Sequence, residues 1–144
     1  PHVIDSWWKD TGRSEDMLEA NRIMLEGLEG SIEGDVCPNS SVSPSVRLGP
    51  GCQVVDSTIR GPAVIGAGVE IRDAYIGPFT SIGDKVRISG AEIENSIVME
   101  SVEICDVETR IDSSLLGRGV SIRPGPGRPR SLSLVLGDNS CVKL

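Results

Sequence analysis

The chain has 144 residues, a formal net charge of −7 and 38% hydrophobic residues, a composition that suits one folded domain. Such an acidic chain lacks the basic surface with which nucleic-acid-binding proteins neutralise phosphates. No apolar run is long enough to span a membrane, and no signal-peptide pattern is present. We therefore expect a cytoplasmic protein with no nucleic-acid or membrane partner. Because the chain begins with Pro1 rather than Met, we expect a piece of a longer protein.

Residues 1–30 form a first segment that predicts a single helix. Ser14 can cap this helix, and Glu15 and Asp16 follow in the first turn, where negative charge suits the helix dipole. Glycines then end the helical pattern at Gly27 and Gly30. We expect the helix to pack its apolar face against the rest of the chain. The residues on or beside that face are Met17, Leu18, Asn21, Met24, Leu25 and Leu28.

The middle of the chain repeats one aliphatic side chain about every six residues. This period matches neither an amphipathic helix nor a half-buried strand. Six residues instead form one side and one corner of a triangular coil, which is the hexapeptide repeat of a parallel β-helix. Ile59 and Ile76 each arrive one residue early, which shortens one side of a coil. The predicted inward positions are Val36, Val42, Leu48, Val54, Ile59, Ile65, Ile71, Ile76, Ile82 and Ile88.

Smaller inward side chains and glycine-containing corners complete each predicted coil. The smaller residues, four positions after the main ones, are Val46, Cys52, Ala63, Val69, Thr80 and Val86. Corners are predicted at Gly49-Pro50-Gly51, Gly66-Ala67-Gly68 and Gly83-Asp84, because glycine accepts the positive φ of a tight turn. The six-residue repeat becomes less regular after Ile97 but continues to Val120. At about eighteen residues per turn, residues 31–122 predict roughly five turns.

The end of the chain predicts a loop followed by a cap. Prolines and glycines in Arg123-Pro124-Gly125-Pro126-Gly127-Arg128-Pro129-Arg130 disfavour helix and strand. Its three arginines could bind phosphate, but a solvated loop is the simpler interpretation. A cap over the last coil is expected because a repeat array must cover its terminal rung. The residues assigned to it are the strand-like Leu132, Leu134 and Leu136, the corner Gly137-Asp138-Asn139-Ser140, and Val142 and Leu144.

The most specific stretch of the sequence is Trp8-Lys9-Asp10-Thr11-Gly12 followed by Glu15-Asp16-Met17-Leu18-Glu19-Ala20-Asn21-Arg22. Together with residues 71–83 and 136–140, it resembles the long form of glucose-1-phosphate thymidylyltransferases (dTDP-glucose pyrophosphorylases), a family of sugar nucleotidyltransferases. The resemblance covers essentially the whole chain. It implies that residues 1–30 end the catalytic domain. It also implies that residues 31–144 form a left-handed parallel β-helix of hexapeptide repeats, with an irregular loop near 123–130.

The resemblance also implies the chemistry of a longer parent protein. In this family a sugar 1-phosphate attacks the α-phosphorus of dTTP, which releases pyrophosphate and gives a dTDP-sugar. A magnesium ion is held by two carboxylates, one of which matches Asp10 here. Magnesium prefers oxygen ligands and offsets the charge on the phosphates. The glycine-rich nucleotide loop, the partner carboxylate and the phosphate-binding basic residues have no counterpart in the sequence. We therefore expect magnesium only in the parent, and a chain that is inactive by itself.

The favoured hypothesis is an assembly or regulatory domain. Its partners would be the catalytic domain of the parent and further copies of the chain, with a trimer favoured. Flat sides of the coil would make the contacts through modest apolar residues such as Tyr75, Val98 and Met99. The acidic residues further along are interpreted as a solvated outer face, namely Glu92, Glu94, Glu100, Glu103 and Glu108.

Two alternatives remain open. A sugar acyltransferase using acetyl-CoA would rely on a histidine base, but the sole histidine, His2, precedes the helix. An allosteric module for a nucleotide or sugar phosphate could use Trp7 and Trp8 as stacking residues, although burial of these rings is the simpler interpretation. The four cysteines form no CxxC pair and are interpreted as reduced thiols rather than zinc ligands.

Overall fold

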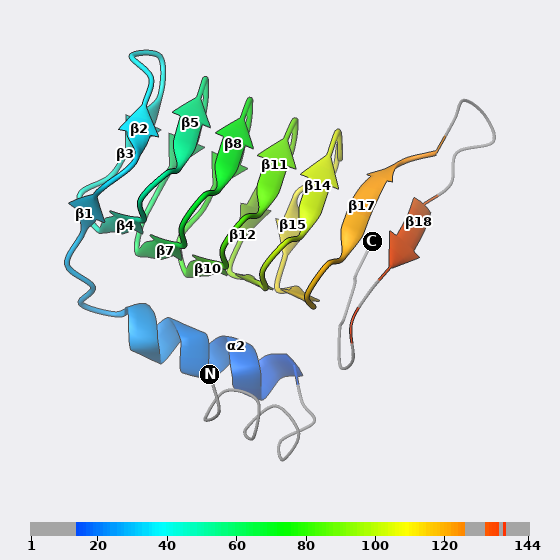
Figure 1. Cartoon of the computed structure of the whole chain (residues 1–144). Helices are drawn as coiled ribbons and strands as arrows, with labels where there is room; N and C mark the ends of the chain where they lie inside the picture. The colour runs from blue at the N-terminus through cyan, green and yellow to red at the C-terminus, as the bar shows by residue number, and fades with distance from the viewer. Residues whose placement is uncertain (1–13, 126–131, 136, 138–144) are drawn as a thin grey trace.

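The computed structural model describes residues 14–125, 132–135 and 137, and its main body is a stack of triangular coils (Figure 1). Each coil adds a short strand to each of three sheets, so the strands pair with those one coil away. Sheet A contains β1 (Ser31–Ile32), β4 (Val46–Leu48), β7 (Ala63–Ile65), β10 (Thr80–Ile82), β13 (Ile97–Val98) and β16 (Leu115–Leu116).

The other two sheets form the remaining sides of the prism. Sheet B contains β2 (Asp35–Val36), β5 (Gln53–Val55), β8 (Glu70–Arg72), β11 (Arg87–Ser89), β14 (Glu103–Cys105), β17 (Ser121–Pro124) and β18 (Leu132–Val135). Sheet C contains β3 (Ser41–Val42), β6 (Thr58–Ile59), β9 (Tyr75–Ile76), β12 (Glu92–Glu94) and β15 (Ile111–Asp112). This arrangement confirms a mainly β, parallel solenoid of about five turns. Its left-handed sense stays a prediction.

The axis of the prism is filled by stacked aliphatic side chains. In sheet A, Leu48 pairs in register with Ile65, and Ile65 pairs with Ile82. The predicted inward residues from Leu48 to Ile88 are at most 3% exposed, and the smaller inward residues are at most 1% exposed. Partners lie 16 to 18 positions apart, as with Ile32 and Leu48 or Val98 and Leu116. The predicted six-residue repeat, with its five-residue steps at Ile59 and Ile76, is therefore confirmed.

The corners use glycine for two different reasons. Gly51 and Gly68 adopt positive φ of 75° and 67°, as predicted. Gly49 does not: a Cβ there would lie 2.5 Å from the carbonyl oxygen of Gly66, so the neighbouring coil excludes a side chain. Asp56 and Asp73 also adopt positive φ, at the corner between sheets B and C. Asp is one of the residue types that tolerates this conformation, and this corner is the one that sequence spacing shortens at Ile59 and Ile76.

The C-terminal end differs in part from the sequence-based prediction. Arg123 and Pro124 were predicted to lie in a loop, but they belong to β17. They pair in antiparallel register with β18, which contains the predicted alternating Leu132 and Leu134. Proline has no N–H to donate, so it is tolerated only where a strand position needs no donor, such as at a sheet edge. Pro124 occupies such a position at the end of β17. The residues from 126 to 131, at 136 and from 138 to 144, including the proposed Val142 and Leu144 cap, lie outside the described part.

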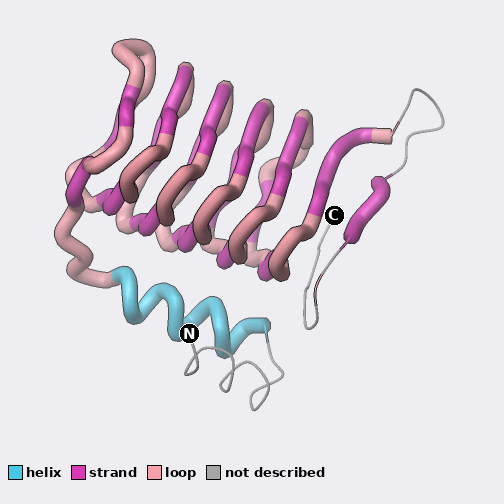
Figure 2. Tube along the Cα trace, in the orientation of Figure 1, coloured by secondary structure: helices cyan, strands magenta, loops and turns pink. Residues whose placement is uncertain are grey.

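The helix α2 (Ser14–Leu25) lies along one flank of the stack, beside sheet A (Figures 1 and 2). It begins at Ser14, and Glu15 and Asp16 occupy its first turn, as predicted. Gly27 follows its last turn with a φ of 75°, the left-handed conformation that ends many helices. The predicted apolar face is confirmed for Met17, Leu18, Asn21 and Leu25, which are buried. Met24, which was predicted to lie beside this face, is 68% exposed.

Candidate functional site

The most elaborate arrangement of side chains in the described part joins α2 to sheet A. We call it the helix clamp and define it by Met17, Leu18, Asn21, Arg22, Phe79, Ser81, Ile97 and Leu115. Its apolar part is a cluster separate from the core of the prism. Met17 and Leu18 pack against Leu115, and Ile97 packs against the same group. Leu115 points away from the prism axis, yet it is 0% exposed because α2 covers it.

A polar pair fixes the position of the helix on this apolar surface. Asn21 Nδ2 donates a hydrogen bond of 3.0 Å to the carbonyl oxygen of Phe79, and Ser81 Oγ donates one of 2.5 Å to Asn21 Oδ1. The guanidinium of Arg22 lies 4.0 Å from the centroid of the Phe79 ring. Apolar contacts tolerate sliding, but directional hydrogen bonds do not. Asn21 therefore sets the register of α2 along the stack.

The turn that leads from α2 into the first coil is held just as closely. Arg47 Nη2 donates a hydrogen bond of 3.3 Å to the carbonyl oxygen of Glu29. A Cβ at Gly30 would collide with the carbonyl oxygen of Pro44 and lie 2.7 Å from that of Val46. The backbone at Gly30 thus lies directly against the next coil. These contacts hold the end of the connection that precedes β1 against the coil.

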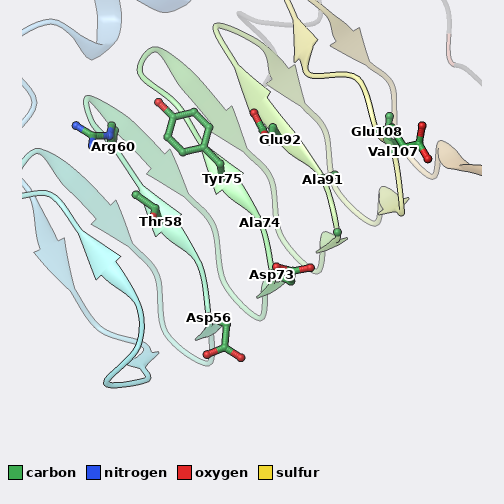
Figure 3. A pocket seen from close by; sticks show the side chains of 11 residues that line it. Asp56, Thr58, Arg60, Asp73, Ala74, Tyr75, Ala91, Glu92, Val107 and Glu108 are labelled. Carbon is green, nitrogen blue, oxygen red and sulfur yellow. The ribbon is translucent and has the colours of Figure 1, made fainter.

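A shallow depression of about 530 Å³ lies on sheet C, where Tyr75 lies between Arg60 and Glu92 of neighbouring coils (Figure 3). The Arg110 guanidinium lies 4.9 Å from the centroid of the Tyr75 ring. Arg110 Nε also donates a hydrogen bond of 2.9 Å to Glu92, and its Nη1 pairs with Glu94. Arg110 therefore engages the ring and both carboxylates.

The hydrogen bonds of Arg110 to Glu92 and then to Glu94 raise the pKa of its guanidinium. This group is protonated throughout the accessible pH range in any case. The remaining residues that line the depression are Asp56, Thr58, Asp73, Ala74, Gly90, Ala91, Val107 and Glu108. The predicted acidic outer face is thus outward, as expected, but three of its members, Glu92, Glu94 and Glu100, are ion-paired across coils.

Sheet B carries a second depression, of about 520 Å³, with charges of both signs. Arg87 Nε lies 3.0 Å from a carboxylate oxygen of Glu70, on the neighbouring strand. The depression is lined by Gly51, Gln53, Gly68, Glu70, Lys85, Arg87, Ser101 and Glu103. Like the first, it is an open, ion-paired surface. Within the described ranges, no group of three or more His, Cys, Asp or Glu residues could hold a metal ion.

The cysteines behave as separate thiols. Cys37, Cys52 and Cys105 are free. Burial raises the pKa of Cys52, and a hydrogen bond to the Asp106 carboxylate raises that of Cys105. The pKa of Cys37 is lowered, first by a hydrogen bond from the backbone of Asp56 and then by one from the Ser40 side chain. No two of these thiols form a bond, which agrees with the interpretation of them as reduced.

The residues that sequence predicted for the site have mixed outcomes. Asp10, the predicted magnesium ligand, lies outside the described residues, as do His2, Trp7 and Trp8. Val98 was predicted to lie on a contact surface, which is wrong: it is 2% exposed and stacks on the axis. Ile97 is the outward member of that strand. Sequence reasoning placed Asn21 on the buried helix face without giving it a role.

No family model matches the chain. Across 99% of its length it is 49% identical to a glucose-1-phosphate thymidylyltransferase of Streptomyces antibioticus and 42% identical to one of Streptomyces griseus, covering 40% of each. It is 38% identical to a low-salt glycan biosynthesis nucleotidyltransferase of Haloferax volcanii, over 99% of this chain and 41% of that protein. The chain thus spans about two fifths of these relatives, which fits a C-terminal part of a glucose-1-phosphate thymidylyltransferase.

Solved structures with a similar fold include acetyltransferases. The acetyltransferase domain of PglB from Neisseria gonorrhoeae, in complex with acetyl coenzyme A, is 21% identical with a TM-score of 0.40, over 68% of this chain and 56% of that one. A GDP-perosamine N-acetyl transferase of Caulobacter crescentus is 20% identical with a TM-score of 0.29, over 85% and 66%. At such TM-scores the likeness carries no argument about function. In the described part, no helix is both long and apolar enough to cross a membrane.

Proposed function

We propose that this chain is the assembly and regulatory β-helix region of a sugar-1-phosphate nucleotidyltransferase that acts in the cytoplasm. The reaction of the whole protein would join dTTP and glucose 1-phosphate to give dTDP-glucose and pyrophosphate. The observation that carries the proposal is the match over 99% of this chain to two fifths of two glucose-1-phosphate thymidylyltransferases.

The helix clamp gives this region a mechanical role. Whatever precedes Ser14 is joined directly to α2, and α2 is locked onto sheet A through Asn21 and Leu115. A domain attached at that point would be held in a defined orientation relative to the coil. Productive geometry in phosphoryl transfer depends on positions held to fractions of an ångström. The coil would therefore act as a rigid scaffold for the catalytic domain.

Asp10 is proposed as one carboxylate ligand of a catalytic magnesium ion in the whole protein. It lies four residues before the start of α2, so the clamped helix would help to fix its position. The ion would supply charge neutralisation at the phosphates. The described residues neither form nor complete this site.

Self-association is proposed through the two flanks of the prism that α2 leaves bare, with a trimer favoured. Light scattering of the chain tests this directly. A species three times the 15.3 kDa of one chain is expected. A strict monomer at high concentration would contradict the assembly part of the proposal.

A chimera tests the enzymatic part. This chain would replace the 142 matching residues of the Streptomyces antibioticus relative, and pyrophosphate release from dTTP and glucose 1-phosphate would be measured. Activity close to that of the unaltered relative is expected, with little activity in this chain alone. Asp10→Asn in the chimera is expected to lower activity and raise the magnesium requirement. A folded but inactive chimera would refute the proposal.

A further inference from the structure

The exposed large apolar side chains of the described part gather at one end of the molecule. They are Ile23 (61% exposed), Met24 (68%) and Ile32 (51%). Ile23 and Met24 lie in the last turn of α2, and Ile32 lies in β1 of the first coil. Figure 1 shows that the end of α2 and β1 occupy the same end of the stack. The bare flanks formed by sheets B and C carry no comparable group among the described residues.

Ile32 is exposed because the first coil has no coil in front of it. It belongs to the same inward ladder as Leu48, with which it pairs in register, but Leu48 is 0% exposed. Val36 and Val42 complete the first coil, and both are only partly buried. The apolar axis of the prism is therefore open at this end. Repeat proteins normally cover such an end because each repeat relies on its neighbours for burial.

The opposite end of the stack is covered, which makes the open end more distinctive. There, β18 pairs antiparallel with β17 and ends the parallel series. Ile122 and Leu116, the last inward residues of sheets B and A, are 6% and 1% exposed. The backbone at Gly137 also lies against Gly117, where a Cβ would be 2.7 Å from the Gly137 Cα. Among the described residues, sheets A and B are covered at this end, although Ile111 of sheet C is only partly buried, while the first coil is uncovered.

We propose that the open first coil and the outer side of the last turn of α2 form a docking surface, named the open end, for the nucleotidyltransferase domain of the same protein. Its apolar contacts are Ile23, Met24, Ile32, Val36 and Val42. This inference rests on the proposed function, since it takes the catalytic domain as the occupant. It goes beyond that function because it assigns a second attachment besides the covalent connection through α2.

The size of the surface favours a tethered occupant over a free one. A triangle with six residues on each side, at about 3.3 Å per residue, has an area of about 170 Å². Stable interfaces between separate proteins bury about 800 Å² on each partner. A second copy or an independent protein would thus gain too little from this end alone. A covalently attached domain meets the surface at a high effective concentration, so a small contact suffices.

The geometry of the connection allows this docking. α2 has twelve residues, so it is about 18 Å long, and it runs from Leu115 near its start towards the first coil near its end. The part of the relatives outside the match amounts to about 210 residues, and a compact domain of that size is about 40 Å across. Such a domain, attached before Ser14, is large enough to span the length of α2 and reach the open end.

Hydrogen exchange tests the docking. Amides of β1, which lies in sheet A and outside the flanks proposed for self-association, would be followed in the chain alone, over a range of concentrations, and in the chimera with the Streptomyces antibioticus relative. The expected result is exchange about tenfold slower in the chimera, and concentration-independent exchange in the chain alone. The triple variant Ile23→Ser, Met24→Ser, Ile32→Ser is expected to abolish the difference. Tyr75→Ser, on the bare flank of sheet C, is the matched control and is expected to preserve it.

Three results would overturn the docking. One is equal exchange of the first coil in the chimera and the isolated chain. Another is protection of β1 that rises with concentration in the chain alone, since a second copy would then cover the open end. A third is protection that survives the triple variant. An active chimera with an unprotected first coil refutes the docking and leaves the proposed function intact, whereas a folded but inactive chimera refutes the proposed function and the docking with it.

Discussion

The flank formed by sheet A and the flank formed by sheet C share the same inward ladder but differ in what they present outward. Sheet A presents Ile97 and Leu115, and α2 covers them. Sheet C presents Tyr75 and Glu92, and both remain at the surface, bridged by Arg110. The inward residues specify the prism, because their stacking fills its axis. The outward residues decide which side of the prism becomes an interface, and only sheet A uses two adjacent apolar residues for this.

The comparison predicts its largest effect at Leu115. Leu115→Ala leaves a cavity beneath α2, and we expect a loss of about 3 kcal/mol of unfolding free energy, typical of a buried leucine. Tyr75→Ala, at an outward position on sheet C, is the matched control and should cost less than about 1 kcal/mol because its site stays open to solvent. Urea unfolding of both variants measures the difference. Equal losses would mean that the two flanks do not differ as described.

The next effect concerns the turn between α2 and the first coil. Gly30→Ala places a Cβ against the carbonyl oxygen of Pro44, and we expect a loss of about 2 kcal/mol from overpacking. Gly27→Ala is the control, because its Cβ would meet nothing within 4 Å. We expect Gly27→Ala to lower the free energy of unfolding by only about 1 kcal/mol, because alanine disfavours the positive φ at this position. If Gly27→Ala proved the more damaging change, the close approach at Gly30 would be unimportant.

Asn21 should contribute less to stability but more to register. Asn21→Ala removes the hydrogen bonds to Phe79 and Ser81, and we expect a loss of about 1 kcal/mol. The expected signature is faster amide exchange in α2 with unchanged exchange in sheet C. Asn39→Ala, at an exposed turn position, should change neither. Uniform faster exchange over the whole chain would show that Asn21 supports global stability rather than the clamp.

The smallest effect separates two thiols on the bare flank of sheet B. The pKa of Cys37 lies below its ordinary value and that of Cys105 lies above it. As pH rises, Cys37 therefore becomes the nucleophilic thiolate first. We expect iodoacetamide to modify Cys37 at lower pH than Cys105, and native Cys52 to resist modification because it is 1% exposed. Mass spectrometry of the cysteine peptides measures this order; the reverse order would contradict the hydrogen-bond assignments.

The same two pKa shifts act on stability in opposite directions. The lowered pKa of Cys37 favours the folded state only where its thiol is ionised, so that contribution is lost as pH falls through the folded pKa. The raised pKa of Cys105 favours the folded state below the unfolded pKa, and its contribution is lost as pH rises. Replacing Cys105 by serine should therefore matter less as the solution becomes more alkaline.

The prism could be predicted from the sequence because each of its sides repeats one aliphatic residue at a fixed spacing. The helix could also be predicted, since Leu18, Asn21 and Leu25 share a face. Val98 was not placed correctly, because two five-residue steps follow each other there, from Ile88 to Ile93 and from Ile93 to Val98. Two adjacent apolar residues in one strand, at Ile97–Val98 and at Leu115–Leu116, could have indicated the contact with α2. In each strand one residue fills the axis of the prism and the other faces α2.

The corners and the polar part of the clamp were less accessible to sequence reasoning. Phe79 and Lys85 adopt positive φ without a residue type that favours it, because stacking of neighbouring coils imposes the corner conformation. The partners of Asn21 lie about sixty positions away, and such a pairing depends on the rotation of α2 about its axis. Asn21 on an apolar helix face was the one local sign that a polar partner was needed.

The central claim is that α2 is folded because sheet A holds it. Helices of about twelve residues are marginal in isolation, so amide exchange of Ser14–Leu25 tests the claim directly. We predict that amides in the second half of α2 exchange at least about a hundredfold more slowly than in an unstructured peptide, and that Leu115→Ala combined with Asn21→Ala removes this protection while sheets B and C keep theirs. Exchange of α2 at the rate of an unstructured peptide in the unaltered chain would contradict the claim.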